Sequence, residues 1–205
     1  MIKVETFPLG ALCANTHLLY DTESKKCLII DLGADFCEIE GVLSARGLKV
    51  GALLLTHGHF DHSFGAASAS ERGIDVYISE KDAYMLKGPK ESLAASFDCP
   101  FEPCARFTAI REGVYEIGGF TVKAIETPGH TKGSVCYVIG DDLFSGDTLF
   151  FESYGRYDLP GGNMIEIVRS AKKLFALDNL TVYTGHDKNT TIEHERRYNP
   201  LSKYI

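Results

Sequence analysis

Short apolar runs, separated by clusters of Gly, Pro, Asn and Asp, recur along most of the chain. Runs of this length that are rich in Val, Ile, Leu, Phe and Tyr are typical of β-strands. In the first half they predict strands over Leu12–Tyr20, Cys27–Asp31, Ala52–Leu55 and Val76–Ser79. In the second half they predict hairpins over Val114–Ile117 with Phe120–Glu126 and over Val135–Ile139 with Asp142–Ser145, and a last strand over Thr181–Thr184.

Longer segments with helical spacing lie between the predicted strands. These segments run from Phe36 to Arg46 with Gly47 as the C-cap, from about His62 to Glu71, from the N-cap Asn163 to about Leu177, and from Ile192 to Tyr198. Ser79 is expected to cap a further short helix. Residues 87–108 contain several prolines and follow neither periodicity, so we expect a flap or an insertion there.

Helices spread through a strand-rich chain favour an α/β fold with two packed sheets and helices outside. The 205 residues fit a single domain over 1–205. The net charge of −7 disfavours nucleic acid or an anionic membrane as a partner, and no apolar run is long enough to span a membrane. Six scattered Cys and a polar N-terminus predict a reduced protein in the cytoplasm. The sequence leaves the oligomeric state open.

A cluster of metal-ligand side chains directly follows the predicted strand Ala52–Leu55. It contains His57, His59, Asp61 and His62, and thus three of the chain's seven His. Side chains alternate along an extended chain, so His57 and His59 are expected to share one side. Unpaired polar groups are costly to bury, whereas imidazole and carboxylate are ligands that zinc and iron accept. The cluster therefore predicts a metal site.

Further residues of the same kinds end other predicted strands, each beside a glycine. His130, Asp147 and His186 follow the strands Phe120–Glu126, Asp142–Ser145 and Thr181–Thr184. We expect them to complete the site. Asp31 ends another strand, where it either hydrogen-bonds to a ligand His or only forms a turn.

Together these motifs resemble the metallo-β-lactamase fold superfamily, and most closely its glyoxalase II-like, hydroxyacylglutathione hydrolase-related branch. The matching segments are the H-x-H-x-D-H run at 57–62, Gly129-His130-Thr131, Gly146-Asp147-Thr148, Gly155-Arg156-Tyr157-Asp158 and Thr184-Gly185-His186-Asp187. The resemblance spans nearly the whole chain, with 87–108 covered least.

The resemblance implies an αββα sandwich with the site at one edge. One metal ion would be held by His57, His59 and His130. A second would be held by Asp61, His62 and His186, and Asp147 would bridge the two ions. We expect two divalent ions, zinc first, although iron and manganese accept the same ligands.

The implied activity is hydrolysis of a small thioester, such as an S-hydroxyacyl thiol, by a hydroxide that the two ions share. Asp61 would orient that hydroxide. Arg156 is expected to pair with a substrate carboxylate or, alternatively, with Asp158. Full glyoxalase II enzymes have a basic residue and a Tyr in this loop, and a C-terminal helical region that carries much of the glutathione site. The thiol therefore stays open.

Two other activities fit the same residues. A mononuclear iron persulfide dioxygenase is one, because relatives with that activity also have Gly-Arg-x-Asp in the loop. A lactonase or lactamase is the other, although Asp147 stands where many zinc β-lactamases have Cys. A nuclease is disfavoured by the acidic charge. The G-x-S-x-G motif of serine hydrolases is absent from the sequence, which disfavours that class.

Overall fold

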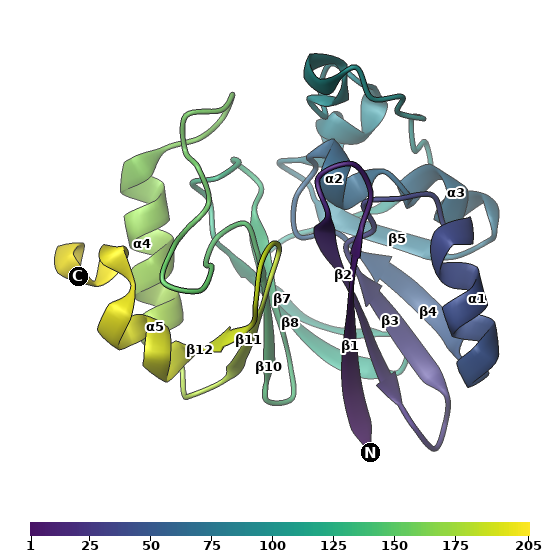
Figure 1. The fold of residues 1–205 in the computed structure, drawn as a ribbon, viewed down its shortest axis with the longest axis horizontal. Coiled ribbons are helices and arrows are strands. Elements are labelled where there is room, and N and C mark those ends of the chain that lie inside the picture. Colours follow the sequence, from purple (N-terminus) through teal and green to yellow (C-terminus); the bar gives the residue numbers. More distant parts are fainter.

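Two six-stranded sheets pack face to face, and helices cover the outer face of each sheet (Figure 1). This computed structural model describes residues 1–205. The layers confirm the predicted α/β class and the αββα order. The site lies between the sheets, at the end where several strands finish.

The first sheet is built from the N-terminal half of the chain. Its strands, in spatial order, are β1 (Ile2–Leu9), β2 (Ala14–Asp21), β3 (Lys26–Ile30), β4 (Lys49–Leu54), β5 (Asp75–Ser79) and β6 (Thr108–Ile110). β1, β2 and β3 pair antiparallel, whereas β3 through β6 pair parallel. The parallel pairs bring the carboxyl ends of β3, β4 and β5 to one edge.

The second sheet is built from the C-terminal half. Its strands, in spatial order, are β12 (Thr190–Thr191), β11 (Thr181–Thr184), β10 (Asp142–Gly146), β9 (Val135–Ile139), β8 (Phe120–Glu126) and β7 (Gly113–Ile117). β10 and β11 pair parallel and the other neighbours pair antiparallel. The ends of β8, β10 and β11 therefore meet at one edge.

The helices pack outside the two sheets. Against the first sheet lie α1 (Cys37–Arg46), α2 (Phe60–Ser63) and α3 (Ala66–Glu71), and against the second lie α4 (Met164–Phe175) and α5 (Ile192–Tyr198). Three short 3₁₀ helices complete the chain: η1 (Ala83–Lys87), η2 (Ala94–Phe97) and η3 (Pro200–Tyr204). No helix is both long enough and apolar enough to cross a membrane.

Alternation along the buried strands explains the sandwich. In β3, Cys27 and Ile29 pack with the helices of the first half, whereas Leu28 and Ile30 pack against the second sheet. A strand that is covered on both faces is apolar at its buried positions, and the four buried residues 27–30 of β3 are all apolar. Fully buried Tyr137 and Phe144 fill the layer between the sheets from the other side.

Several predicted elements are confirmed. Both hairpins form, with turns at Gly118-Gly119 and Gly140-Asp141. Gly47 ends α1 in the left-handed conformation, with φ of 63°. Asn163 caps α4, where its side chain accepts hydrogen bonds from two backbone amides of the first turn.

Other predictions were wrong in ways that tertiary contacts explain. The helix predicted from His62 to Glu71 begins at Phe60 and breaks at Gly65. The Gly65 amide donates to the Leu32 carbonyl instead of continuing the helix, and a Cβ at Gly65 would lie 2.3 Å from the Leu32 side chain. A neighbouring segment thus interrupts a locally favourable helix.

The remaining differences concern strands at sheet edges and the irregular segment. β1, β6 and β12 were not predicted, and the strand predicted from Leu12 begins at Ala14. Ser79 ends β5 and caps nothing, because the next helix begins at Ala83. Residues 87–108 contain η2 and otherwise irregular backbone that lies above α2 in Figure 1.

Candidate metal centre

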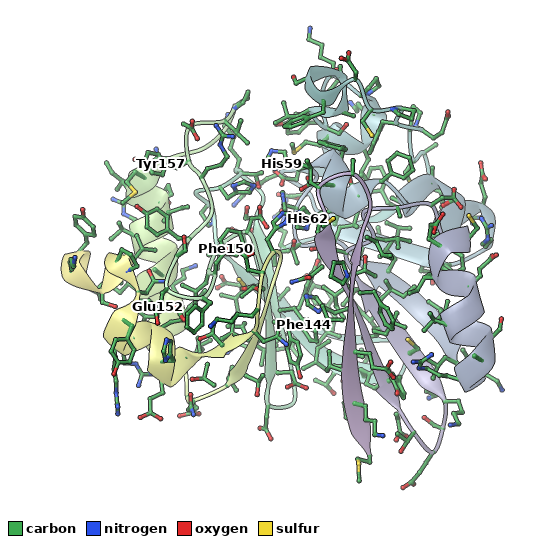
Figure 2. All side chains as sticks on the ribbon, in the orientation of Figure 1. His59, His62, Phe144, Phe150, Glu152 and Tyr157 are labelled. Atoms are coloured by element: carbon green, nitrogen blue, oxygen red, sulfur yellow. The ribbon has the colours of Figure 1, made fainter.

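The seven predicted ligands lie together at the edge where the strand ends of both sheets meet. They come from the loop after β4, from α2, and from the residues that follow β8, β10 and β11: His57, His59, Asp61, His62, His130, Asp147 and His186. Figure 2 shows His59 and His62 between the two halves, near the ends of the strands. Side chains up to 129 positions apart in sequence are thus neighbours.

His57, His59 and His130 form one group. Each offers a ring nitrogen, and these three nitrogens lie within 4.8 Å of one another. Nδ1 of His59 is 2.9 Å from Nε2 of His130. All three side chains are buried. Three imidazoles that converge in this way have the composition and spacing of a three-His metal site.

Asp61, His62 and His186 form a second group with the same spacing limit of 4.8 Å. Nε2 of His62 lies 3.4 Å from Nε2 of His186, and Oδ2 of Asp61 lies 3.3 Å from the latter atom. His62 is fully buried, whereas His186 stays a quarter exposed. The second group is therefore nearer to solvent than the first.

Asp147 lies between the two groups. One carboxylate oxygen is 3.3 Å from Nε2 of His62, and the other is 3.5 Å from Nε2 of His130. The second oxygen is also 3.8 Å from Nε2 of His186. A single carboxylate thus faces both groups.

Buried polar atoms without hydrogen-bond partners indicate that these side chains are arranged to bind a metal ion. Nε2 of His57, Nε2 of His59 and Oδ1 of Asp147 are buried without a hydrogen-bond partner. Buried polar atoms without partners are rare in proteins and costly. His59 faces His130 with its Nδ1, so its Nε2 points away from that ring. His57 and Asp147 belong to one group whose ligand atoms lie within 4.8 Å of one another, where a cation would satisfy the orphan Nε2 of His57 and Oδ1 of Asp147 together.

Asp31 orients His62, as one of the two sequence interpretations proposed. Its Oδ2 accepts a hydrogen bond of 2.8 Å from Nδ1 of His62, which leaves Nε2 of that ring facing Asp147. The same carboxylate accepts hydrogen bonds from the amide and the hydroxyl of Thr56, at 2.7 and 2.8 Å. A carboxylate behind a ligand His sets both its tautomer and its direction.

Close backbone contacts hold the other rings in place. Nδ1 of His130 donates to the carbonyl of Arg156 at 2.7 Å, so its Nε2 faces the site. Gly185 lies so near the centre that a Cβ there would be 2.2 Å from Oδ1 of Asp147. Only glycine fits at the position before His186, because any side chain would clash with Asp147.

Burial keeps two of the imidazoles neutral. It lowers the pKa of His59 to about 3, and the neighbouring His130 acts in the same direction. Burial, followed by the charge of His62, lowers the pKa of His57 well below its ordinary value. Neutral imidazole is the form that binds a metal, so both rings are ready as ligands at neutral pH.

Opposite charges dominate the second group. Burial acts to lower the pKa of His62, but the carboxylates of Asp147 and Asp61 outweigh it and raise that pKa. Burial acts to raise the pKa of Asp147, but His62 holds it well below its usual range. The centre thus carries ionised carboxylates that attract a cation.

A cavity of about 300 Å³ opens over this floor. Five of the seven predicted ligands line it, and His57 and His62 lie beneath them. The lining consists of Leu12, His59, Phe60, Asp61, Leu93, Phe97, His130, Asp147, Phe150, Arg156, Leu159 and His186. Arg156 therefore faces the cavity. It also forms the alternative ion pair with Asp158, through two N–H···O bonds of 2.8 Å.

Two residues that the sequence did not single out hold loops of the site. Asp82 is buried and accepts hydrogen bonds from Gly58, Thr131 and Gly133, and so joins the loops that carry His57, His59 and His130. Asn15 donates to the carbonyls of Thr184 and Asp187, on either side of His186. Neither residue lies within a recognisable motif. Their role becomes visible only in the fold, where both side chains are buried and hydrogen-bond to the loops.

Comparison with known proteins identifies the family. The model of the metallo-beta-lactamase superfamily matches residues 11–186. The chain is 32% identical over 210 residues to the hydroxyacylglutathione hydrolase GloC of Haemophilus influenzae, and the match covers 98% of each chain.

Solved structures give the same result. BLEG-1, described as a B3 metallo-beta-lactamase, superposes with a TM-score of 0.89 at 33% identity, over 97% of this chain and 99% of that chain. TTHA1623, solved in a di-iron-bound form, gives a TM-score of 0.86 at 30% identity, over 96% and 99% of the two chains. Relatives named for different activities thus share one fold.

Proposed function

Because this chain belongs to the metallo-beta-lactamase superfamily, we propose that it is a metal-dependent hydrolase that cleaves small thioesters, such as those of S-hydroxyacyl thiols. The observation that carries the proposal is the pair of His/Asp groups with Asp147 between them, at the floor of a cavity. The partner is accordingly a small molecule. The name of GloC supports a thioester substrate.

Each of the two groups of side chains is assigned to one metal ion. His57, His59 and His130 would hold one divalent ion, Asp61, His62 and His186 would hold another, and Asp147 would face both. A divalent ion there supplies a water nucleophile near neutral pH and a Lewis acid for the carbonyl oxygen. Zinc fits this nitrogen and oxygen donor set, and iron or manganese fits it as well.

The chain's own residues position the reaction. Although burial acts to raise the pKa of Asp61, the nearby His62 and His186 lower it, so this carboxylate is ionised at the cavity wall and accepts a hydrogen bond from the attacking water. The water oxygen bonds to the carbonyl carbon and the C–S bond breaks. The thiolate leaves, one water proton ends on it or in solvent, and a carboxylic acid is released. Arg156 lies in the wall, where it would bind a polar end of the substrate.

Two observations favour testing other activities beside this one. The relative solved with two iron ions supports iron as the metal, which the persulfide dioxygenase alternative also requires, but as a single ion. The name of BLEG-1, a B3 metallo-beta-lactamase, supports cleavage of a cyclic amide. The hydrolases would use both groups of ligands, whereas the dioxygenase would hold a single iron ion, so the metal count, the substrate and oxygen consumption together decide between these activities.

The test combines metal analysis with a substrate panel of thioesters, lactones, a β-lactam and a persulfide. We expect two metal ions per chain, thioester hydrolysis without oxygen consumption, and loss of this activity on chelation with recovery when metal is returned. The Asp147→Ala variant should lose tight binding of at least one ion, because the carboxylate that faces both groups is gone. Full thioesterase activity after chelation would contradict the mechanism, and two tightly bound ions in Asp147→Ala would contradict the bridging role. Oxygen uptake with the persulfide would favour the dioxygenase.

A further inference from the structure

We propose that the substrate carries a hydrocarbon acyl arm, longer than that of a lactoyl group, which binds against Leu93 and Phe97 in the cavity wall. This inference rests on the proposed thioesterase function and adds the chemistry of the acyl group. It concerns binding, so the bond changes are those given above.

An apolar surface leads from the reactive floor to the mouth of the cavity. Phe60 lies between the predicted ligands His59 and Asp61 and is only 2% exposed. Its ring packs against that of Phe97, with ring centroids 5.2 Å apart, and Phe97 is 52% exposed. An acyl arm that extends from the floor toward Phe97 would lie beside these two rings.

Exposed apolar side chains gather at this mouth from separate parts of the chain. Leu12, in the turn between β1 and β2, is 40% exposed and lines the same cavity as Phe97. Leu93 and Leu159 add further hydrocarbon from two other segments. Apolar surface beside a reactive floor is typical of a ligand pocket, whereas isolated exposed apolar residues are ordinary.

The backbone of the wall is held in an unusual conformation. Leu93 has φ of 68° and Asp98 has φ of 49°, so left-handed residues precede and follow η2. A branched side chain such as Leu is disfavoured there, where Asn or Gly would be comfortable. Strained residues cluster at ligand-binding sites, so the conformation of Leu93 supports a role in binding.

The wall is fastened directly to the site. The carbonyl of buried Ser92 accepts a hydrogen bond of 3.0 Å from the Phe60 amide, and its hydroxyl donates to the Gly88 carbonyl at 2.9 Å. Leu93 therefore has a set position relative to the first residue of α2. In Figure 1 this segment lies above α2, and the loop after β10 lies in the other half of the molecule, beside α4.

Charge in the cavity argues for an uncharged arm. Arg156 is the one Lys or Arg side chain among the lining residues, and both of its hydrogen bonds go to Asp158. A highly charged thiol such as glutathione would find one cation, already paired. Cellular thiol carriers are generally polar. We therefore assign the apolar wall at Leu93 and Phe97 to the acyl arm and the part of the cavity near Arg156 to the thiol.

The test uses acyl thioesters of one uncharged thiol, N-acetylcysteamine, with acyl chains from acetyl to octanoyl. With the metal-loaded protein, kcat/KM should rise about two- to fourfold per added methylene until the cavity is filled. Leu93→Asn and Phe97→Gln should flatten this series, so that kcat/KM for the octanoyl thioester falls by a larger factor than kcat/KM for the acetyl thioester. Ile165→Asn, at an exposed apolar position outside the cavity, should leave the series unchanged.

Stability separates a binding role from a structural one. Because Asn tolerates the left-handed conformation of residue 93, Leu93→Asn should keep or raise the melting temperature while it flattens the series. A lower melting temperature with an unchanged series would make Leu93 structural and overturn the proposal. An equal series in Phe97→Gln and the unaltered protein would also overturn it.

Other outcomes distinguish this inference from the proposed function. Hydrolysis that is independent of acyl length, that is fastest with a lactoyl glutathione thioester, or that rises with the length of the thiol arm overturns the inference and leaves the thioesterase in place. Calorimetry with the free carboxylates from acetate to octanoate supplies a second readout. Binding that strengthens with length in a protein that hydrolyses no thioester supports the apolar site and contradicts the thioesterase.

Discussion

His17 shows how one buried side chain connects the two sheets. Its Nε2–H donates to the carbonyl of Thr184, at the end of β11, at 3.1 Å, so its Nδ1 accepts from the hydroxyl of Thr6 at 2.9 Å. The ring also packs against Phe144 and Tyr183. Burial lowers the pKa of His17 to about 3, although the Thr184 carbonyl opposes the shift. His17 is therefore a neutral bridge between the two sheets in the core.

The depressed pKa predicts acid sensitivity that can be assigned to this residue. In the unfolded chain His17 binds a proton below its ordinary pKa of 6.5, whereas the folded protein resists protonation until about pH 3. The free energy of unfolding should therefore fall as the pH drops through this window, by about 1.4 kcal/mol per pH unit for this one group. Urea unfolding of the metal-free protein measures how the free energy of unfolding depends on pH between pH 6 and 4. In His17→Gln this slope should be smaller by about 1.4 kcal/mol per pH unit, which corresponds to one proton. Equal slopes in the two proteins would show that His17 makes no such contribution.

At the scale of elements, the site depends on loops that are held from behind. Asp82 follows β5 and precedes η1, where it caps no helix amide. Its carboxylate instead accepts from the Gly133 amide at 2.8 Å, the Thr131 hydroxyl at 2.6 Å and the Gly58 amide at 3.3 Å. The loops after β4 and β8 belong to different sheets, and this one side chain joins them.

Asp82→Asn tests that role. The new amide group presents a donor to backbone N–H groups, so at least one buried hydrogen bond is lost and the free energy of unfolding should fall by roughly 1–3 kcal/mol. Because the loops that carry His57, His59 and His130 would separate, metal affinity should fall by about 10- to 100-fold. Competition with a chelator measures the affinity, and Asp141→Asn in an exposed turn is the matched control. A stable variant with unchanged metal affinity would exclude a positioning role.

For the whole molecule, hydrogen bonds across the sandwich tie the two sheets together at the site. The Tyr137 hydroxyl of β9 donates to the Leu55 carbonyl at 2.8 Å, and the Val135 amide donates to the Thr56 carbonyl at 2.9 Å. On the other side of the site, the backbone N–H of Asn15 in β2 donates to the Gly185 carbonyl at 2.8 Å. The two halves thus meet by directional bonds as well as by apolar packing, which sets how the ligands of one half face those of the other.

Tyr137→Phe tests the strength of this connection. The variant keeps the ring in the core but leaves the buried Leu55 carbonyl without its donor, so the free energy of unfolding should fall by about 1–2 kcal/mol. Tyr183→Phe is the control, because the Tyr183 hydroxyl makes no hydrogen bond within the protein. Chemical denaturation compares the two variants. If both lose the same free energy, the cross-sheet bond adds nothing to stability.

Local rules were sufficient wherever the cause of a structure lies within a few residues. The apolar run of β3 and the two hairpins follow from apolar content and from glycines at the turns. The two helix caps follow from a glycine that accepts the left-handed conformation and from an Asn side chain that bonds nearby backbone amides. The helix predicted across Gly65 failed because Leu32 and Ala34 occupy the space beside it. β12 has only two residues and exists because β11 offers it a partner, so no local pattern could reveal it.

The sequence by itself determined the residue types at the strand ends, and with them the expectation of a metal centre made of His57, His59, Asp61, His62, His130, Asp147 and His186. It also determined the layers, since period and apolar content depend on neighbours along the chain. Only the tertiary structure decided which strand ends meet, that Asp147 lies between two groups, and that Asp82 and Asn15 hold their loops. The reason is that these relations join residues far apart in sequence, whose proximity depends on sheet order and cross-sheet packing rather than on any local preference.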